Sequence, residues 1–196
     1  MEAAVCFSGG KDSTLTALLL EEFYDVTLVC ATAGVTDAAE HAREAAEQVG
    51  FPFETAALEE SVVREAAAGM VEDGYPRNGI QRIHEHALEV VAGLEYDAVA
   101  VGTRRDDRVP TVSRARAQSL EDRHGIDYLS PLSGFGRGAV DALVDAQLEV
   151  ESGPSETIPK GDYETELRAV IADEHGAEAV AEIFPEHTQT RVRGRR

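Results

Sequence analysis

Short apolar runs alternate with helical patterns through the first two thirds of the chain, and this alternation constrains its fold more than any other feature. Short runs bounded by turn or polar residues predict buried strands, and apolar residues at helical spacing follow each of the first four runs. The expected strands are residues 3–7, 26–31, 51–57, 98–101 and 128–129, and the expected helices are residues 12–23, 37–49, 59–72, 80–94 and 111–124. Such alternation indicates βαβ units, a parallel sheet and therefore an α/β fold.

The carboxyl ends of the strands define where a ligand should bind. In open parallel sheets, ligands bind beyond these ends, at the point where the strand order reverses. The first expected strand leads into residues 8–13, and the fourth leads into residues 102–108. We therefore expect these two loops to converge on one site.

The last third of the chain carries a weaker pattern. We expect a helix over residues 138–147, a turn-rich connector over residues 152–161, and a helix that Asp162 caps and that ends near His175. Arginines near the end give the sequence a basic tail. We divide the chain into a domain over residues 1–135 and a helical extension with a basic tail over residues 136–196, packed on the same domain.

The loop after the first expected strand has the composition of a phosphate site. Two adjacent glycines let the main chain approach a ligand closely and adopt positive φ. The following helix directs its free amides and the positive end of its dipole at the loop. A lysine adds a point charge, two serines add hydroxyl donors, and an aspartate either holds Mg²⁺ or orients the lysine. In order, the residues are Ser8, Gly9, Gly10, Lys11, Asp12 and Ser13.

These six residues resemble the S-G-G-x-D-S signature of the PP-loop ATP pyrophosphatase superfamily, which is related to the adenine nucleotide alpha-hydrolases. The alternative is an ordinary glycine-rich turn. The resemblance implies a Rossmann-like three-layer sandwich with a parallel five-stranded sheet in the order 3-2-1-4-5. It also implies that ATP is the ligand and that residues 8–13 bind its pyrophosphate.

A second segment resembles the G-H-x-x-D-D-x-x-x-T motif that many of these proteins carry after the fourth strand. Residues 102–111 keep the glycine, the paired aspartates and the final threonine, with Thr103 in place of the usual histidine. The resemblance implies that Gly102 and Thr103 contact the nucleotide. Carboxylates at a strand end can hold Mg²⁺ against phosphate oxygens, and a solvated acidic turn is the alternative. The expected Mg²⁺ ligands are Asp12, Asp106 and Asp107.

The resemblance implies an enzyme that cleaves ATP to AMP and pyrophosphate. A substrate oxygen would attack the α-phosphate, and positioning and charge stabilisation would carry most of the catalysis. We assign the catalytic roles to Lys11, Asp12 and Asp107. We expect a tRNA base as the acceptor, and a homodimer or a partner subunit to assist RNA binding. The alternatives are an ammonia-dependent amide ligase and a non-catalytic nucleotide-binding subunit of a modification complex.

The strong negative charge of the chain does not exclude RNA as a partner. The chain has 37 acidic and 18 basic residues, and only two of the basic residues, Lys11 and Lys160, are lysines. This composition is typical of adaptation to a salt-rich cytoplasm, where a Debye length of about 3 Å at molar salt screens repulsion of a polyanion. Several arginines within residues 104–116 form a local positive region, which either clamps phosphates or pairs with nearby carboxylates.

A few residues outside the two loops are weaker candidates. We expect Cys6 in the core and Cys30 as a buried residue rather than a sulfur relay. The paired cysteines of sulfur-transferring relatives are missing, which argues against that chemistry. We expect His84 at the surface, with the cleft as the alternative, and consider Lys160 a candidate substrate contact. No apolar run reaches membrane length, so we expect a cytoplasmic protein.

Overall fold

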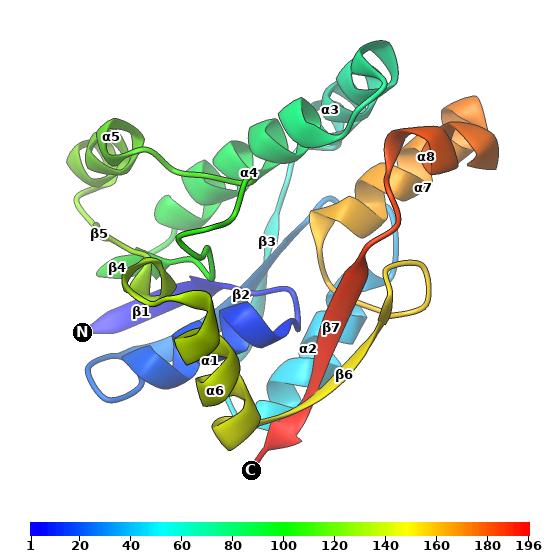
Figure 1. Cartoon of the computed structure of the whole chain (residues 1–196). Helices are drawn as coiled ribbons and strands as arrows, with labels where there is room; N and C mark the ends of the chain where they lie inside the picture. Colours follow the sequence, from blue (N-terminus) through cyan, green and yellow to red (C-terminus); the bar gives the residue numbers. More distant parts are fainter.

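The computed structural model describes residues 1–196 and contains two separate sheets (Figure 1). The larger sheet has five parallel strands in the order β3-β2-β1-β4-β5, which confirms the predicted order. The central strand β1 pairs with β2 on one side and with β4 on the other. The strands are β1 (Glu2–Cys6), β2 (Asp25–Thr32), β3 (Phe53–Ala57), β4 (Ala98–Ala100) and β5 (Asp127–Leu129).

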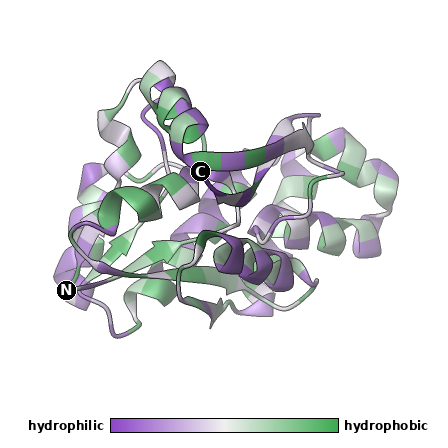
Figure 2. Ribbon diagram, turned by 90° about the horizontal axis from the view of Figure 1, so that it is seen from below, coloured by the Kyte–Doolittle hydropathy of each residue, from purple (hydrophilic) through white to green (hydrophobic).

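Helices cover both faces of this sheet and complete the three-layer α/β sandwich (Figure 1). Helices α1 and α2 pack on one face, α4 packs on the other, and α5 lies against β5. In Figure 2 some of the helices carry hydrophobic residues along one side and hydrophilic residues along the other, and α2 and α4 are the clearest cases among the sheet-covering helices. None of the helices has the length and the hydrophobicity that crossing a bilayer requires. The helices are α1 (Lys11–Leu20), α2 (Ala38–Val49), α3 (Glu60–Asp73), α4 (Arg77–Ala92) and α5 (Arg114–His124).

Three predicted helix boundaries differ from those in the structure by three residues, and one of these is the helix predicted to end at residue 23, which ends at Leu20. The helix predicted over residues 80–94 begins at Arg77, because Pro76 at the N-cap fixes a φ compatible with helix entry. The helix predicted from residue 111 begins at Arg114, where the Ser113 side chain accepts a hydrogen bond from the Arg116 amide. The two shifts at helix starts change which residues border the carboxyl edge of the sheet.

The last third of the chain contains a two-stranded sheet in addition to the helices that the sequence predicts. Asp162 caps α7 as predicted, accepting a hydrogen bond of 3.0 Å from the Thr165 amide. Strands β6 and β7, however, pair as an antiparallel ribbon along α2 (Figure 1). The elements are a 3₁₀ turn (Pro131–Gly134), α6 (Arg137–Gln147), β6 (Leu148–Pro154), α7 (Tyr163–His175), α8 (Ala177–Ile183) and β7 (Thr188–Arg195).

The predicted basic tail is in fact strand β7, and the protein neutralises its charges. Arg191 is only 3% exposed and contacts Glu44 of α2 at 2.5 Å. Arg193 pairs with a glutamate across the ribbon, and Arg195 pairs with a glutamate after α1 and stacks on an aromatic ring. Carboxylates neutralise these three arginines, so β7 gives no support for RNA binding.

Glu166 ties α7 to the segment that follows β2. Its side chain is 1% exposed, and its Oε1 accepts hydrogen bonds from Thr32 Oγ1 at 2.8 Å and from the amides of Ala33 and Val35 at 3.1 Å. Its Oε2 accepts a further bond of 3.0 Å from the Ala33 amide. One buried carboxylate therefore shapes a loop at the carboxyl edge of the sheet.

We expect Glu166→Ala to lower the free energy of unfolding by about 3 kcal/mol, because buried amides lose a charged acceptor. Glu166→Gln keeps one acceptor oxygen and should lose less. Urea denaturation measures both changes. Glu178→Ala, at an exposed position of α8, is the matched control and should stay within about 0.5 kcal/mol of the wild type. Equal stability of the Glu166→Ala and Glu178→Ala variants would refute this assignment.

Candidate functional site

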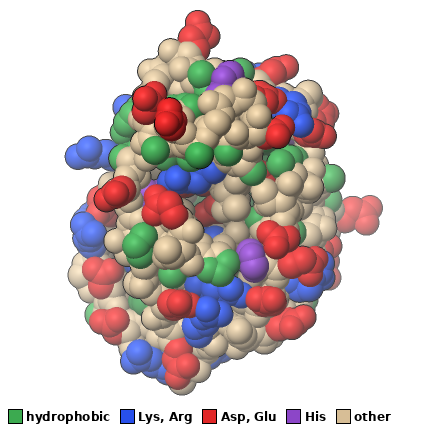
Figure 3. Space-filling view, turned by 90° about the vertical axis from the view of Figure 1, so that its right-hand side faces the viewer, with side chains coloured by type: hydrophobic (Ala, Val, Ile, Leu, Met, Phe, Trp, Pro, Cys, Tyr) green, Lys and Arg blue, Asp and Glu red, His purple; other side chains and the backbone are tan.

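A cleft of about 800 Å³ opens at the carboxyl ends of the parallel strands, where the sequence predicts a ligand. Its walls come from the loops after β1 and β4, from α4, and from residues 160–164 and 184–190 of the C-terminal region. Figure 3 shows a hollow near the centre of one face, with basic side chains beside it. The cleft thus joins both predicted loops to a region that the sequence did not assign to the site.

The loop after β1 and the start of α1 form one wall of the cleft. Gly10 is the N-cap of α1, with extended backbone (φ −84°, ψ 162°) and no side chain of its own, and Thr190 Oγ1 of β7 accepts a hydrogen bond of 3.4 Å from the Lys11 amide. The amides of Asp12 and Ser13 are therefore available to an anion, in line with the predicted phosphate site. Gly9 has the predicted positive φ of 80° and is the one loop residue outside the cleft lining. The lining residues of this loop are Ser8, Gly10, Lys11, Asp12 and Ser13.

Main-chain amides of the C-terminal region donate hydrogen bonds to the carbonyl groups of this loop. The Gly161 amide donates a hydrogen bond of 3.0 Å to the Ser8 carbonyl. The Val192 amide, on β7, donates one of 2.9 Å to the Gly9 carbonyl. Both loop carbonyls are thus bound within the protein, which favours a loop that presents amides rather than carbonyls to a ligand.

Both lysines of the chain lie at this wall. Lys11 Nζ is 3.1 Å from Asp12 Oδ1 and 3.6 Å from Asp141 Oδ1. Lys160 Nζ is 3.1 Å from Asp162 Oδ2 and 3.5 Å from the point that a Cβ on Gly10 would occupy. Lys160, a candidate ligand contact, therefore lies beside the glycines of the loop after β1.

Asp162 anchors Lys160 as a carboxylate. Burial opposes ionisation, but the Lys160 ammonium and the hydrogen bonds from Thr165 outweigh it and hold the pKa of Asp162 below its ordinary value. The same carboxyl group caps α7, so the position of Lys160 depends on the start of that helix.

The loop after β4 passes directly against α1, as the sequence predicts. A Cβ on Gly102 would lie 2.7 Å from the Ser13 amide nitrogen, so only glycine allows this approach. Thr103 follows in the cleft lining, and its carbonyl accepts a hydrogen bond of 3.2 Å from Ser130 Oγ. Gly102 and Thr103 are thus brought to the first loop.

An arginine lies between two of the three predicted Mg²⁺ ligands. Asp12 and Asp107 both line the cleft, with Arg104 Nε 3.9 Å from Asp12 Oδ2 and Arg104 Nη2 3.0 Å from Asp107 Oδ1. Asp106 is exposed and lies outside the lining. No three His, Cys, Asp or Glu side chains form a metal-binding group. Two carboxylates suit Mg²⁺ that also binds phosphate oxygens, provided that Arg104 gives up its contacts with them.

In the cleft lining, a buried histidine and a partly buried tyrosine form a pair. His84 is 6% exposed, and its Nδ1 lies 3.0 Å from the Tyr163 hydroxyl. Its Nε2 is buried without a hydrogen-bond partner. Burial lowers the pKa of His84 to about 4 and raises the pKa of Tyr163, so both are neutral near pH 7. The surface position predicted for His84 is wrong, because α4 turns this residue toward α7.

Neither cysteine has the properties of a sulfur carrier. Burial raises the pKa of both thiols to about 12, so neither is a thiolate at neutral pH. Cys30 is buried as predicted and donates a hydrogen bond of 3.2 Å to the Gly161 carbonyl. It therefore helps to position the Lys160 segment. Cys6 packs partly against the core and partly toward the cleft.

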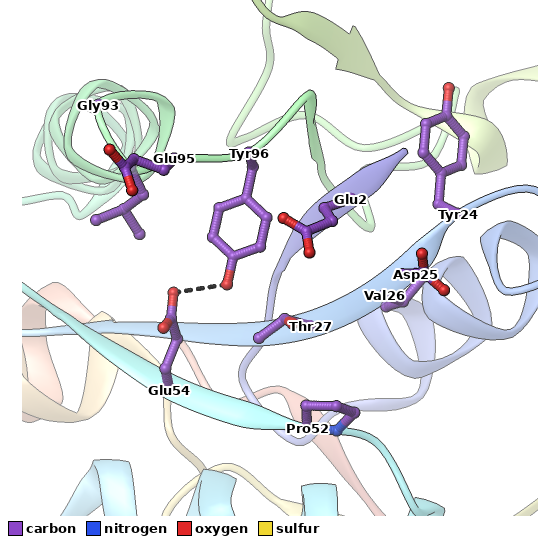
Figure 4. Close-up of a pocket in the computed structure, with 11 residues that line it drawn as sticks. Glu2, Tyr24, Asp25, Val26, Thr27, Pro52, Glu54, Gly93, Glu95 and Tyr96 are labelled. Carbon is purple, nitrogen blue, oxygen red and sulfur yellow. Dashed lines mark hydrogen bonds between the residues drawn. The ribbon is translucent and has the colours of Figure 1, made fainter.

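A second hollow, of about 820 Å³, lies at the opposite, amino edge of the sheet (Figure 4). Its carboxylates include Glu2, Glu54 and Glu95, and the Tyr96 hydroxyl donates a hydrogen bond of 2.9 Å to Glu54. No basic side chain lines it. Because it would repel phosphate, the cleft at the carboxyl edge is the candidate nucleotide site.

Comparison with known proteins places the chain in a family. A family of unknown function, DUF7411, matches residues 1–194. The chain belongs to that family. Uncharacterized protein MJ0690 from Methanocaldococcus jannaschii is 40% identical over 195 residues, which are 99% of this chain and 96% of that protein.

A solved structure has the same fold over the whole chain. A crystal structure described as a predicted subunit of tRNA methyltransferase, from Methanocaldococcus jannaschii, superimposes with a TM-score of 0.90 and 38% identity over 100% of this chain and 98% of that one. The U34-tRNA thiolase NcsA from Methanococcus maripaludis, with its 4Fe-4S cluster, gives a TM-score of 0.43 and 15% identity over 93% of this chain and 70% of that one, a likeness too distant to carry an argument.

We expect His84 to make the stability of the protein depend on pH. Its pKa is about 4 in the folded state and 6.5 ordinarily, so the unfolded chain binds the extra proton first and stability falls from about pH 6.5 to pH 4. Relative to His84→Asn, the wild type should lose roughly 3 kcal/mol over this range. Urea denaturation at several pH values measures the difference. A pH-independent difference between the two proteins would contradict the buried neutral imidazole.

Proposed function

We propose that this chain is a PP-loop ATP pyrophosphatase that binds Mg·ATP in the cleft and adenylates a substrate in tRNA modification. The observation that carries this proposal is the loop of residues 8–13 at the end of β1. There, a helix N-terminus with free amides at Asp12 and Ser13 and both lysines of an acidic chain meet at one wall of the cleft. This is the chemistry that a pyrophosphate group requires.

Each part of the cleft has a role in this proposal. The first-turn amides of α1, with Lys11 and Lys160, bind the phosphates, and Gly102 and Thr103 border the nucleotide. Asp12 and Asp107 are the residues that would hold Mg²⁺, which neutralises phosphate charge when bound. Arg104 is placed to bind phosphate oxygens once it leaves these carboxylates. Catalysis then consists of positioning and charge stabilisation.

The tRNA part of the proposal is supported by a relative. The Methanocaldococcus jannaschii structure that shares this fold over the whole chain is described as a predicted subunit of tRNA methyltransferase. The cleft also has room beyond the lysines, where the wall carries Tyr75, His84 and Tyr163. An aromatic wall of this kind suits a base, because bases stack on aromatic side chains.

A nucleotide-binding subunit of a tRNA-modification complex is the second candidate. Arg104 occupies the space between Asp12 and Asp107, which a turnover site would leave to the metal ion. The description of the relative as a subunit favours the same candidate. In such a complex, ATP binding would control a partner, and the partner would carry the chemistry.

We expect Lys11→Ala and Lys160→Ala each to weaken Mg·ATP binding by about 10- to 100-fold, which corresponds to about 1.5–3 kcal/mol per charge-assisted hydrogen bond. Isothermal titration calorimetry measures the affinities. Arg43→Ala, which removes an exposed charge paired with Glu40 on α2, is the matched control and should bind ATP normally. Unchanged affinity in both lysine variants would exclude the cleft as the nucleotide site.

Product analysis separates the two candidates. An enzyme should release AMP and pyrophosphate from Mg·ATP in the presence of its RNA substrate, and Lys11→Ala should abolish that release. Tight ATP binding without AMP formation, with or without RNA, would favour the subunit. Mass spectrometry of tRNA nucleosides from a deletion strain should show the loss of one modified nucleoside in either case. An unchanged nucleoside profile would contradict the tRNA role.

A further inference from the structure

The arginines of this chain divide into a paired and an unpaired group. Away from the cleft, arginines form ion pairs with nearby carboxylates, as expected in a chain with about twice as many acidic as basic residues. Exposed pairs of this kind contribute little to stability, but they leave the arginines without free charge for a partner. The paired arginines are Arg43, Arg64, Arg82, Arg116, Arg123, Arg168, Arg191, Arg193 and Arg195.

Five exposed arginines form neither an ion pair nor a side-chain hydrogen bond, and we call them the rim arginines. Arg77 directly follows Tyr75 and Pro76 of the cleft lining, and Arg114 begins α5 four residues after Pro110 of the lining. Arg137 lines the cleft itself, and Arg105 and Arg108 lie in the loop whose neighbouring residues line it. The Arg105 guanidinium lies 3.6 Å from the point that a Cβ on Gly136 would occupy, beside Arg137. The rim arginines are Arg77, Arg105, Arg108, Arg114 and Arg137.

Three rim arginines occupy helix N-termini, where a positive charge destabilises the helix. Arg77, Arg114 and Arg137 are the first residues of α4, α5 and α6, and none of these helices has an acidic residue in its first turn. A cation at a helix N-terminus opposes the helix dipole. By contrast, the first turns of α2, α3, α7 and α8 all contain glutamate. Helix stability therefore does not explain the arginines around the cleft.

The loop that carries Arg105 and Arg108 is held in a defined shape. The Arg104 amide donates a hydrogen bond of 2.8 Å to Asp107 Oδ2, and the Asp107 amide returns one of 3.3 Å to the Arg104 carbonyl. Gln81 of α4 fixes the far end of the loop through hydrogen bonds with the main chain of Thr111 at 2.7 and 2.9 Å. The unpaired guanidinium groups thus project from a fixed support.

We propose that the rim arginines bind the sugar-phosphate backbone of an RNA substrate and thereby bring one of its bases to the cleft. This inference rests on the proposed role in tRNA modification. Guanidinium groups bind phosphates through two parallel hydrogen bonds, and five of them exceed what the triphosphate of one nucleotide needs. RNA fits better than an acidic protein, because the cleft behind the rim has an aromatic wall and the unpartnered Nε2 of buried His84.

The test compares two triple variants in binding to labelled tRNA by fluorescence anisotropy at about 0.1 M salt. The rim variant carries Arg105→Glu, Arg108→Glu and Arg114→Glu, which lie outside the cleft lining. The control variant carries Arg43→Glu, Arg82→Glu and Arg193→Glu and has the same net charge. We expect the rim variant to bind tRNA about 100-fold more weakly and to reduce the slope of log K against log salt by roughly 2 to 3. The control should bind tRNA within about threefold of the wild type.

Mg·ATP affinity, measured on the same proteins, separates this inference from the proposed function. Lost tRNA binding with unchanged ATP affinity in the rim variant supports the inference. Equal tRNA binding by the rim and control variants overturns it, as does a wild type that binds ATP but no tRNA. A wild type that binds tRNA through the rim but no ATP refutes the nucleotide function and leaves the inference intact. Rim-dependent binding of polyglutamate in preference to tRNA would assign the surface to an acidic protein and overturn it.

Discussion

Two main-chain hydrogen bonds between distant parts of the chain determine the form of the cleft. Gly161 and Val192 donate to the carbonyls of Ser8 and Gly9, so the loop after β1 is held from behind. The same C-terminal segment carries Lys160 to the glycines of that loop and uses Asp162 both to anchor the lysine and to cap α7. The candidate phosphate site is therefore built by two regions that are far apart in sequence.

Local signals made most of the sheet and half of the site predictable. Alternating apolar runs and helical spacings specified the parallel strands, and strand direction then required the loops after β1 and β4 to meet. The small residues at the meeting point, above all Gly102 against Ser13, allow that contact. Asp162 was recognisable as a cap because it precedes a helical pattern, a signal that needs no tertiary information.

The features that the sequence did not reveal all depend on tertiary contacts. Strands β6 and β7 carry many charges that pair with each other and with α2. Their sequences therefore predict a connector and a basic tail. His84 is buried on α4, and Tyr163 of α7 lies against it. Arg104 forms an ion pair with Asp107 and lies near Asp12. A motif of paired aspartates does not indicate this arrangement. The bond from Cys30 to Gly161 likewise links residues that no local pattern connects.

The attachment of the loop to the C-terminal ribbon makes ligand binding and local folding a single equilibrium. If the segment around Gly161 detaches, the loop after β1 loses the bond that supports Ser8, and Lys160 leaves the glycines. A ligand that binds only the attached arrangement then stabilises it by mass action, by about 2.7 kcal/mol at a ligand concentration 100 times its Kd. Occupancy of the cleft would thus be transmitted to the whole ribbon along α2, as protection of its amides from hydrogen exchange.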